Sequence, residues 1–196
     1  MLSLIASISL FSKRDYTTLI IADGNSYVSG NGHKPFTSYL KDAQVLNFGV
    51  GGQTTIQMLS DAEKQVLPNY SRGKRNILIA IEGGNDIFFH GSVDSAILHY
   101  KQYCLAARQI GFFVIASTTI PRRQASDYGD SLACFNDKLR EFNAQLVGLA
   151  CFDAVIRPDT DAAFRSFASP GYDIDGIHPN DYGQKVIAGL VEGVIK

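Results

Sequence analysis

Several residue types that mark specialised classes of protein are scarce in this sequence. Its 196 residues include no tryptophan, two methionines, six prolines and three cysteines. Cys104, Cys134 and Cys151 form neither a CxxC pair nor a histidine-cysteine spacing typical of a metal site. An odd number of cysteines without a signal peptide also argues against a disulfide scaffold. We therefore expect three buried free thiols.

An excess of charge of one sign is absent too. Lysine and arginine number 18 and aspartate and glutamate 19, which gives a formal net charge of −1. The basic residues are scattered and form no extended basic face, so the sequence predicts no nucleic-acid partner. Small clusters such as Arg122-Arg123 are interpreted as solvated loop charges, and the alternative is a contact for an anionic substrate.

A hydrophobic run long enough to span a bilayer is also missing. Residues 1–11 are apolar but lack a basic start and a small-residue cleavage site, and they are shorter than the roughly 20 residues of a spanning helix. They fit an amphipathic first helix about as well as a truncated export signal. We expect an N-terminal extension at residues 1–16, no integral membrane segment, and a cytoplasmic location slightly favoured over secretion.

The features that are present suit one globular domain. Apolar residues make up 45% of the sequence and charged residues 19%, close to the averages of globular proteins. A chain of this length builds one hydrophobic core, and neither repeats nor a linker rich in Pro, Gly or Ser divide it. We therefore treat residues 1–196 as a single domain with one site.

Apolar runs and helical periods alternate along the chain. Five short runs are nearly continuous in apolar residues, which indicates strands covered on both faces. They are residues 18–22, 45–48, 76–81, 112–117 and 152–156. Between them, apolar residues spaced by three and four indicate helices, most clearly across residues 132–146 and 93–104. Ser92 is the expected N-cap of the second of these helices and Gly111 its stop.

This alternation predicts an α/β fold of βαβ units, with a mostly parallel five-stranded sheet and helices on both faces. Ligands of such folds bind beyond the carboxyl ends of the strands. Four polar, glycine-bearing segments fall where such a site is expected, three of them directly after a predicted strand. They are residues 23–26, 49–54, 83–86 and 175–180.

Residues in these segments suit nucleophilic catalysis. Ser26 follows the first strand, where a turn would present its hydroxyl at the start of a helix, and a helix N-cap is its structural alternative. A serine hydroxyl needs a base to remove its proton, and His178 is the best-placed histidine. A carboxylate on the far ring nitrogen would fix the imidazole tautomer, and both Asp173 and Asp175 lie close enough in sequence to do so.

An oxyanion intermediate needs hydrogen-bond donors, and two residues are candidates. The backbone N–H of Gly52 lies in a glycine loop that allows close approach, and the Asn85 amide can supply a second donor. The structural alternatives are a turn glycine and a loop-capping amide. Residues 49–54 also resemble a phosphate-binding loop superficially, but they lack its Gly-Lys-Ser/Thr ending.

Together the four segments resemble the ordered sequence blocks of the SGNH (GDSL-like) hydrolases. The blocks are Gly24-Asn25-Ser26, Asn47-Phe48-Gly49-Val50-Gly51-Gly52, Gly83-Gly84-Asn85-Asp86 and Asp175-Gly176-Ile177-His178-Pro179, and the resemblance spans about residues 18–195. It implies that Ser26 is the nucleophile and that Asp175 and His178 complete a catalytic triad. It also implies an oxyanion hole made by the Ser26 backbone N–H, Gly52 and Asn85. The fold it implies is a flavodoxin-like, three-layer α/β/α arrangement with a five-stranded parallel sheet.

The first block departs from the family pattern. Where the family has Gly-Asp-Ser, this chain has Gly24-Asn25-Ser26, so an amide replaces a carboxylate of the same shape. Because that aspartate organises neighbouring loops in the family, we expect the change to affect rate rather than reaction type. Asp23 is a candidate to supply the missing charge. Other polar residues nearby are interpreted as structural or show no partner pattern: Asp86, His33, His90 and His99.

The resemblance implies a serine esterase that works through an acyl-enzyme and needs neither metal nor cofactor. The polar segment at residues 121–130 favours a small-molecule or carbohydrate ester with a short acyl group, such as an O-acetylated sugar. Phe88 and Phe89 could instead line a groove for a longer chain, as in lysophospholipases or thioesterases of this fold. Acyl transfer to an alcohol and an inactive binding module are further alternatives, and the sequence predicts no oligomeric state.

Overall fold

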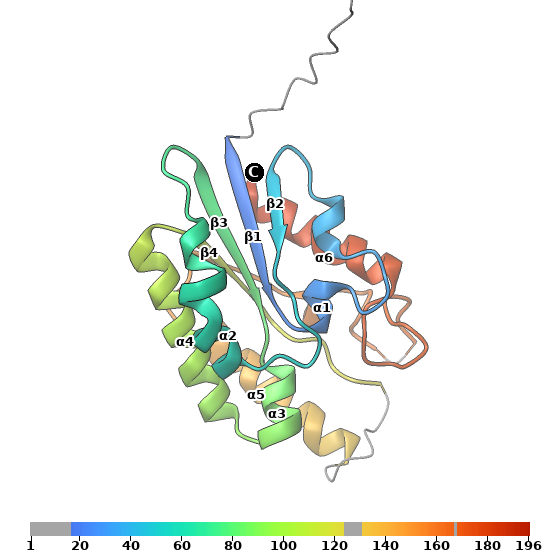
Figure 1. Ribbon diagram of the computed structural model, residues 1–196. Coiled ribbons are helices and arrows are strands. Elements are labelled where there is room, and N and C mark those ends of the chain that lie inside the picture. Colours follow the sequence, from blue (N-terminus) through green and yellow to red (C-terminus); the bar gives the residue numbers. More distant parts are fainter. Residues whose placement is uncertain (1–16, 124–130, 167) are drawn as a thin grey trace, which may run out of the picture.

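The structure of the chain is a computed structural model that describes residues 17–123, 131–166 and 168–196 (Figure 1). The N-terminal extension expected at residues 1–16 lies outside the described residues. So does most of the polar segment expected at residues 121–130.

Within these described ranges, five parallel strands form one central sheet. They are β1 (Thr18–Gly24), β2 (Gln44–Asn47), β3 (Arg75–Ile81), β4 (Phe113–Ser117) and β5 (Ala154–Ile156). Their order across the sheet is β2-β1-β3-β4-β5, and every neighbouring pair is parallel. The predicted α/β fold with a five-stranded parallel sheet is therefore confirmed, and each strand lies within about two residues of its expected position.

The described residues also form six α-helices and three short 3₁₀ turns, which lie between or after the strands. The helices are α1 (Ser26–Ser29), α2 (Thr55–Gln65), α3 (Gly84–His90), α4 (Val93–Ile110), α5 (Leu132–Val147) and α6 (Asp181–Ile195), and the turns are Phe36–Tyr39, Leu67–Asn69 and Pro158–Thr160. Helix α4 begins as predicted, since the Ser92 hydroxyl accepts a hydrogen bond from the Ser95 N–H at 3.2 Å. It ends as predicted at Gly111, whose φ of 112° is left-handed. None of these helices is both long and apolar enough to cross a membrane.

The strands are apolar without alternation because both faces of the sheet are covered. In β1, Leu19 and Ile21 pack with α2, α4 and α5, while Ile20 and Ala22 pack with α1 and α6. Figure 1 shows the same three layers, with α2 and α4 on one side of the strands and α6 on the other. Burial on two faces makes every position of a strand apolar, as the sequence predicted.

Strand β1 continues two residues beyond its predicted end, because Asp23 and Gly24 still pair with Ala80 and Ile81 of β3. Gly24 has a φ of 148°, and a Cβ atom there would lie 2.0 Å from the Ile81 carbonyl oxygen. Only glycine fits this close approach of two backbones. The chain consequently turns from β1 into α1 with Ser26 at the first helical position.

The cysteines differ in part from the sequence prediction. Cys104 and Cys151 are free and buried, as expected, but Cys134 is free and exposed. Cys134 lies in the first turn of α5, and the buried residues of that helix, such as Phe135 and Leu139, point to a different side. The prediction of three buried thiols was therefore wrong for Cys134.

Candidate active site

A cleft of about 320 Å³ opens at the carboxyl ends of the central strands. Its walls come from the segments that follow β1, β2, β3 and β4 and from the loop that precedes α6. The lining residues are Asn25, Ser26, Tyr27, Asn31, Gly51, Gly52, Gly84, Asn85, Phe88, Phe89, Arg122, Ile177 and His178. The structure thus brings together residues from all four predicted sequence blocks.

Ser26 is the first residue of α1, and the preceding residue, Asn25, caps this helix. The Asn25 side-chain oxygen accepts a hydrogen bond from the Tyr27 N–H at 2.9 Å, so Asn25 is the N-cap of this short helix. The N-cap of α1 is therefore Asn25, and the structural alternative of a capping role does not apply to Ser26. The Ser26 hydroxyl remains available to face the cleft, although the residue as a whole is only 8% exposed.

A chain of hydrogen bonds runs from Ser26 through His178 to Asp175. The Ser26 Oγ atom lies 2.9 Å from His178 Nε2, and His178 Nδ1 lies 2.5 Å from Asp175 Oδ2. The competing carboxylate, Asp173, contacts a different histidine, with its Oδ2 atom 3.0 Å from His33 Nε2. The spatial arrangement therefore pairs His178 with Asp175. It also gives His33 a partner that the sequence pattern did not indicate.

The Asp175 side chain is held in place by hydrogen bonds that it accepts from its own loop. Its Oδ1 atom accepts hydrogen bonds from the backbone N–H groups of Ile177, at 2.8 Å, and His178, at 3.0 Å. Partial burial would raise the pKa of Asp175, but the hydrogen bonds from the His178 ring and these N–H groups outweigh it and lower the pKa. The carboxylate is thus ionised where it can orient the imidazole and stabilise an imidazolium.

The loop that carries His178 is attached to two other parts of the cleft. The Tyr27 hydroxyl donates a hydrogen bond to the Ile177 carbonyl at 3.1 Å, and the Tyr27 ring packs edge-on to His178 at 6.0 Å. From the opposite side, the Arg123 N–H donates to the Gly176 carbonyl at 2.7 Å. These contacts fix the imidazole relative to α1 before any substrate binds.

The expected oxyanion donors also lie at the cleft. Gly52 has a φ of 78° at the tip of the loop after β2, and within the described residues neither its N–H nor that of Ser26 donates a hydrogen bond. The Asn85 amide donates one of its two hydrogens to the Gln53 carbonyl at 2.8 Å, which leaves the other for a ligand. The arrangement provides donors from three segments for a developing negative charge.

Glu82, a buried residue that the sequence pattern did not indicate, accepts hydrogen bonds from the third block. Glu82 is fully buried at the end of β3, and its Oε1 atom accepts hydrogen bonds from the N–H groups of Gly83, at 2.9 Å, and Asn85, at 3.1 Å. Among the described residues its other oxygen has no partner of good geometry, although the nearby Asn25 amide acts as a donor that lowers its pKa. Burial dominates and raises the pKa of Glu82 well above the ordinary value.

The carboxyl group beside Asn25 is therefore Glu82, whereas Asp23 lies elsewhere. The side chain of Asp23 accepts a hydrogen bond from the Tyr103 hydroxyl at 2.6 Å, on the face of the sheet that α4 covers. Burial raises the pKa of Asp23 to about 6, despite hydrogen bonds from Tyr103 and Gly24 that lower it. The idea that Asp23 supplies the charge missing at Asn25 was therefore wrong.

Asp86 contacts the helix that follows the second block. Its two carboxylate oxygens accept hydrogen bonds from the Thr55 N–H, at 2.9 Å, and the Thr55 hydroxyl, at 2.6 Å. Because Thr55 is the first residue of α2, this pair joins the start of α2 to α3. The contact matches the structural interpretation of Asp86.

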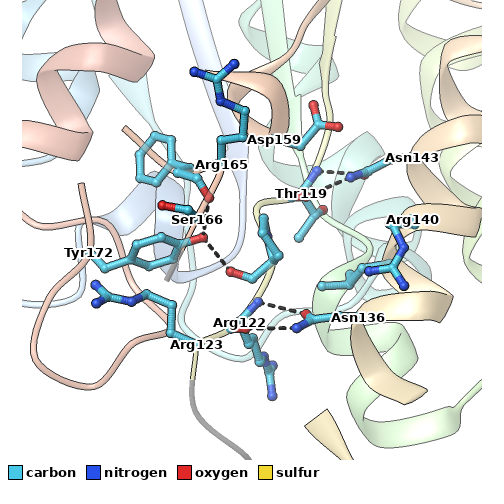
Figure 2. Close-up of a pocket in the computed structure, with 13 residues that line it drawn as sticks. Thr119, Arg122, Arg123, Asn136, Arg140, Asn143, Asp159, Arg165, Ser166 and Tyr172 are labelled. Carbon is cyan, nitrogen blue, oxygen red and sulfur yellow. Dashed lines mark hydrogen bonds between the residues drawn. The ribbon is translucent and has the colours of Figure 1, made fainter. Parts of the chain in front are cut away.

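Arg122 also differs from its sequence interpretation. It is 8% exposed, so it is not a solvated loop charge. It lines the cleft and also a second cavity of about 320 Å³ behind it, which Figure 2 shows. It packs against Phe88 and Phe135, whose ring centres lie 4.5 Å and 4.2 Å from the guanidinium carbon. These aromatic residues are far from Arg122 in sequence, so no local pattern indicated the contact.

Metal-binding side chains do not gather at this site. Over the stretches of chain that the structure describes, no group of three or more His, Cys, Asp or Glu side chains could hold a metal ion. His178 and Asp175 contact each other and Ser26, as a proton-transfer chain requires.

Comparison with known proteins agrees with the resemblance noted from the sequence. The profile of the GDSL-like lipase/acylhydrolase family matches residues 22–186, which is most of the chain and includes all four blocks. None of the curated proteins matches this sequence significantly.

Solved structures of the same fold are numerous, and three illustrate the likeness. A GDSL-like lipase from Bacteroides thetaiotaomicron is 17% identical with a TM-score of 0.74, over 91% of this chain and 88% of that chain. A lipolytic protein of the G-D-S-L family from Veillonella parvula is 18% identical with a TM-score of 0.72, over 90% and 97%. An acetylxylan esterase from Geobacillus stearothermophilus is 14% identical with a TM-score of 0.63, over 89% and 92%. At these identities the likeness establishes the fold.

Proposed function

The chain belongs to the GDSL-like lipase/acylhydrolase family, and on that premise we propose that it is a serine esterase that hydrolyses carboxylic esters through an acyl-enzyme. The observation that carries the proposal is the hydrogen-bonded chain from Ser26 Oγ to His178 and on to Asp175, inside a cleft at the strand ends. A serine with this arrangement is activated for attack on a carbonyl carbon.

In the acylation step Ser26 is the nucleophile. Its Oγ atom attacks the ester carbonyl carbon while His178 Nε2 removes the hydroxyl proton across the existing 2.9 Å hydrogen bond. The imidazolium that forms is stabilised by the ionised Asp175 on its other nitrogen. Collapse of the tetrahedral intermediate breaks the bond to the alcohol oxygen, which leaves with the proton that His178 returns. The acyl group remains on Ser26.

The oxyanion of each tetrahedral intermediate is held by the N–H groups of Ser26 and Gly52 and by the free hydrogen of the Asn85 amide. Water then attacks the acyl-enzyme, with His178 as its general base, and the carboxylic acid leaves as Ser26 recovers its proton. These steps need no metal ion.

A short acyl group on a small polar or carbohydrate alcohol fits this cleft best. Its volume is about 320 Å³, near the lower limit of ordinary ligand pockets. Polar groups of Asn31, Asn85 and Arg122 form part of its walls and could hydrogen-bond a hydroxylated alcohol. Two solved proteins of the same fold are acetylxylan esterases, which supports an O-acetylated sugar as a substrate class.

A longer acyl chain is the second candidate, and two aromatic residues favour it. Phe88 and Phe89 both line the cleft, and Phe89 is 56% exposed. An exposed aromatic beside an oxyanion site can cover several methylene groups of a fatty acyl chain. The two candidates differ in how the rate depends on chain length.

The test is hydrolysis of p-nitrophenyl acetate, butyrate and decanoate by the wild-type protein beside Ser26→Ala. We expect kcat/KM to fall from acetate to decanoate and activity to vanish in the variant. A rise toward decanoate would select the longer-chain candidate. If the wild-type protein turned over none of these esters, a binding module without turnover would replace the esterase.

Hydrolysis and acyl transfer use the same residues, so the acceptor decides between them. Product analysis with and without a sugar alcohol at high concentration measures the partition of the acyl-enzyme. We expect free acid to dominate in both cases. A dominant acylated alcohol would make the protein a transferase.

A further inference from the structure

The Arg122 guanidinium packs against two aromatic rings that are nearly perpendicular to each other, with an interplanar angle of 78°. The ring centres of Phe88, in α3, and Phe135, in α5, lie 4.5 Å and 4.2 Å from its carbon atom. The two ring centres are 6.4 Å apart, so the rings contact the guanidinium from neighbouring directions rather than from opposite faces. These contacts hold the group in place through cation–π attraction and leave its N–H donors for other partners.

The backbone at Arg122 is fixed as firmly as its side chain. The Asn136 side chain accepts a hydrogen bond from the Arg122 N–H at 2.9 Å and donates one to its carbonyl at 2.9 Å, as Figure 2 shows. The next residue, Arg123, donates its N–H to Gly176 in the loop between Asp175 and His178. Arg122 is thus joined both to α5 and to the segment that carries the catalytic pair.

The guanidinium has donors but no acceptor. In the described part of the chain, no side chain or carbonyl accepts a hydrogen bond from it and no carboxylate forms an ion pair with it. Among the described residues, the fully buried side-chain atoms without a partner are Gln53 Oε1, Glu82 Oε2 and His99 Nδ1, so the Arg122 nitrogen atoms are not among those sealed off without a partner. An arginine that is 92% covered, held by two aromatic rings and without an acceptor among the described residues is arranged to receive an oxygen ligand.

From these contacts we propose that Arg122 binds a carboxylate group carried by the ester substrate, within the cleft that holds Ser26. The inference rests on the proposed esterase function and names the substrate class of the same site. The planar fork of a guanidinium matches the two oxygens of a carboxylate, and shielding by two aromatic rings strengthens the pairing.

One ionised carboxylate lies among the groups that act on Arg122. Burial lowers the pKa of Arg122, while the nearby groups of Tyr27, Glu82 and Asp175 raise it. Since burial raises the pKa of Glu82 well above its ordinary range, the ionised Asp175 is the principal negative charge of this set.

The cavity behind Arg122 does not provide an alternative site of the same kind. It is also lined by Arg123, Arg140 and Arg165. Arg140 is exposed and pairs with Asp137. In Figure 2 the side chains of Arg122 and Arg165 point away from each other, so they do not converge on one ligand.

The first test compares two esters that differ only in a carboxylate. Para-acetoxybenzoate and its methyl ester both lose an acetyl group from a para-substituted phenol that carries either a carboxylate or a neutral methyl ester. Mono-p-nitrophenyl glutarate with p-nitrophenyl pentanoate places the charge on the acyl side instead. The ratio of kcat/KM for the charged ester over the neutral one is measured for wild type, Arg122→Gln and Arg122→Lys. Arg165→Gln is the matched control, because it removes the same charge from an exposed position on the second cavity.

We expect Arg122→Gln to lower this ratio by about tenfold to a hundredfold for at least one ester pair, as is usual for a lost charged hydrogen bond. Arg122→Lys should give an intermediate ratio because it keeps the charge but loses the planar fork. Arg165→Gln should leave the ratio unchanged. A ratio that changes by less than about threefold in Arg122→Gln, or equally in Arg165→Gln, would overturn the proposal.

A binding measurement separates failure of this inference from failure of the esterase function. Para-acetamidobenzoate is titrated calorimetrically into Ser26→Ala and into Ser26→Ala/Arg122→Gln, neither of which needs to turn over. We expect the dissociation constant to be at least about tenfold higher in the double variant. Equal affinities, or no binding to Ser26→Ala, would contradict a carboxylate site at Arg122 even if the protein hydrolyses neutral esters.

Discussion

At the scale of single residues, the polar groups of the cleft are held by contacts that leave their reactive atoms free. The Asn85 amide donates one hydrogen to the Gln53 carbonyl, and its other hydrogen remains available. Asp175 uses one oxygen for two backbone N–H groups and the other for His178. This arrangement orients each group before substrate binds, which is the condition under which hydrogen bonds stabilise a transition state most.

Replacement of Asn85 by alanine tests the proposed oxyanion donor. We expect kcat for p-nitrophenyl acetate to fall by about 10²–10³, or about 2.7–4 kcal/mol, with a much smaller change in KM, because the donor acts mainly on the intermediate. Circular dichroism would check that the variant is folded. A kcat within about a factor of three of wild type would remove Asn85 from the oxyanion hole.

Asp23 should make the stability of the fold depend on pH. Its pKa is about 6 in the folded chain, above the ordinary 3.8, so the folded state binds the proton more tightly. The resulting stabilisation is complete below about pH 4 and is lost as the pH rises through about 6. Between these limits the free energy of unfolding of wild type should fall by about 3 kcal/mol relative to Asp23→Asn. Urea unfolding of both proteins measures this difference, and parallel pH curves would show that Asp23 titrates normally.

The sequence predicted those site residues whose signal is local, and it missed those that depend on packing. Ser26, His178 and Asn85 lie in glycine-bearing segments next to strand ends or loops, so type and position together marked them. Glu82 gave no such signal, and Arg122 was interpreted as a solvated charge, with a contact for an anionic substrate as the alternative. Arg122 is buried against aromatic rings from α3 and α5, and Glu82 is buried just after the end of β3. Both depend on tertiary packing, which a local sequence pattern does not indicate.

At the scale of secondary-structure elements, α6 fixes the loop of His178 against the rest of the fold. The Asn180 side chain caps this helix by accepting a hydrogen bond from the Gly183 N–H at 2.9 Å. Gln184, fully buried, accepts from the Phe36 N–H at 2.8 Å and donates to the Tyr27 carbonyl at 3.2 Å. The first turn of α6 therefore sets the distance between His178 and the helix that carries Ser26.

Two glycines of α6 should respond oppositely to the same substitution. A Cβ atom at Gly183 would lie 2.2 Å from the Gly171 carbonyl oxygen, whereas one at Gly189 would meet nothing within 4 Å. We expect Gly183→Ala to destabilise the protein by about 2 kcal/mol or more, because backbone must move. Gly189→Ala should stabilise it by about 0.5–1 kcal/mol, because alanine favours the helix. Thermal unfolding of both variants measures the signs, and equal shifts would contradict this packing.

The elements themselves were largely predictable, and their ends less so. Apolar runs located all five strands, and Ser92 and Gly111 marked the limits of α4. The extension of β1 to Gly24 was not predicted, because Asp23 and Gly24 are untypical of strands. Their pairing with β3 is a property of the sheet rather than of the local sequence.

At the scale of the whole molecule, the order of the strands creates the site. Because β1 lies between β2 and β3, the segments that carry Ser26, Gly52 and Asn85 emerge side by side from one edge of the sheet. The loop before α6 then reaches the same edge with His178. Alternation of strands and helices predicts a parallel sheet with its site beyond the carboxyl ends of the strands, but it does not specify this strand order.

The proposed ester hydrolysis should proceed without a metal ion. The proposed steps use only side chains and backbone N–H groups of the protein, with His178 as the proton carrier. After exhaustive dialysis against EDTA, we expect kcat/KM for p-nitrophenyl acetate to stay within about a factor of two of the untreated value. Loss of activity that returns on addition of zinc, magnesium or calcium would contradict this mechanism.

The role of Ser26 as nucleophile is tested by the mass of the protein after reaction with a fluorophosphonate, followed by peptide mapping. We expect a single adduct on Ser26 in wild type, much slower labelling in His178→Ala, and none in Ser26→Ala. An adduct on another residue, or labelling that persists in Ser26→Ala, would contradict the assignment of Ser26 as the nucleophile.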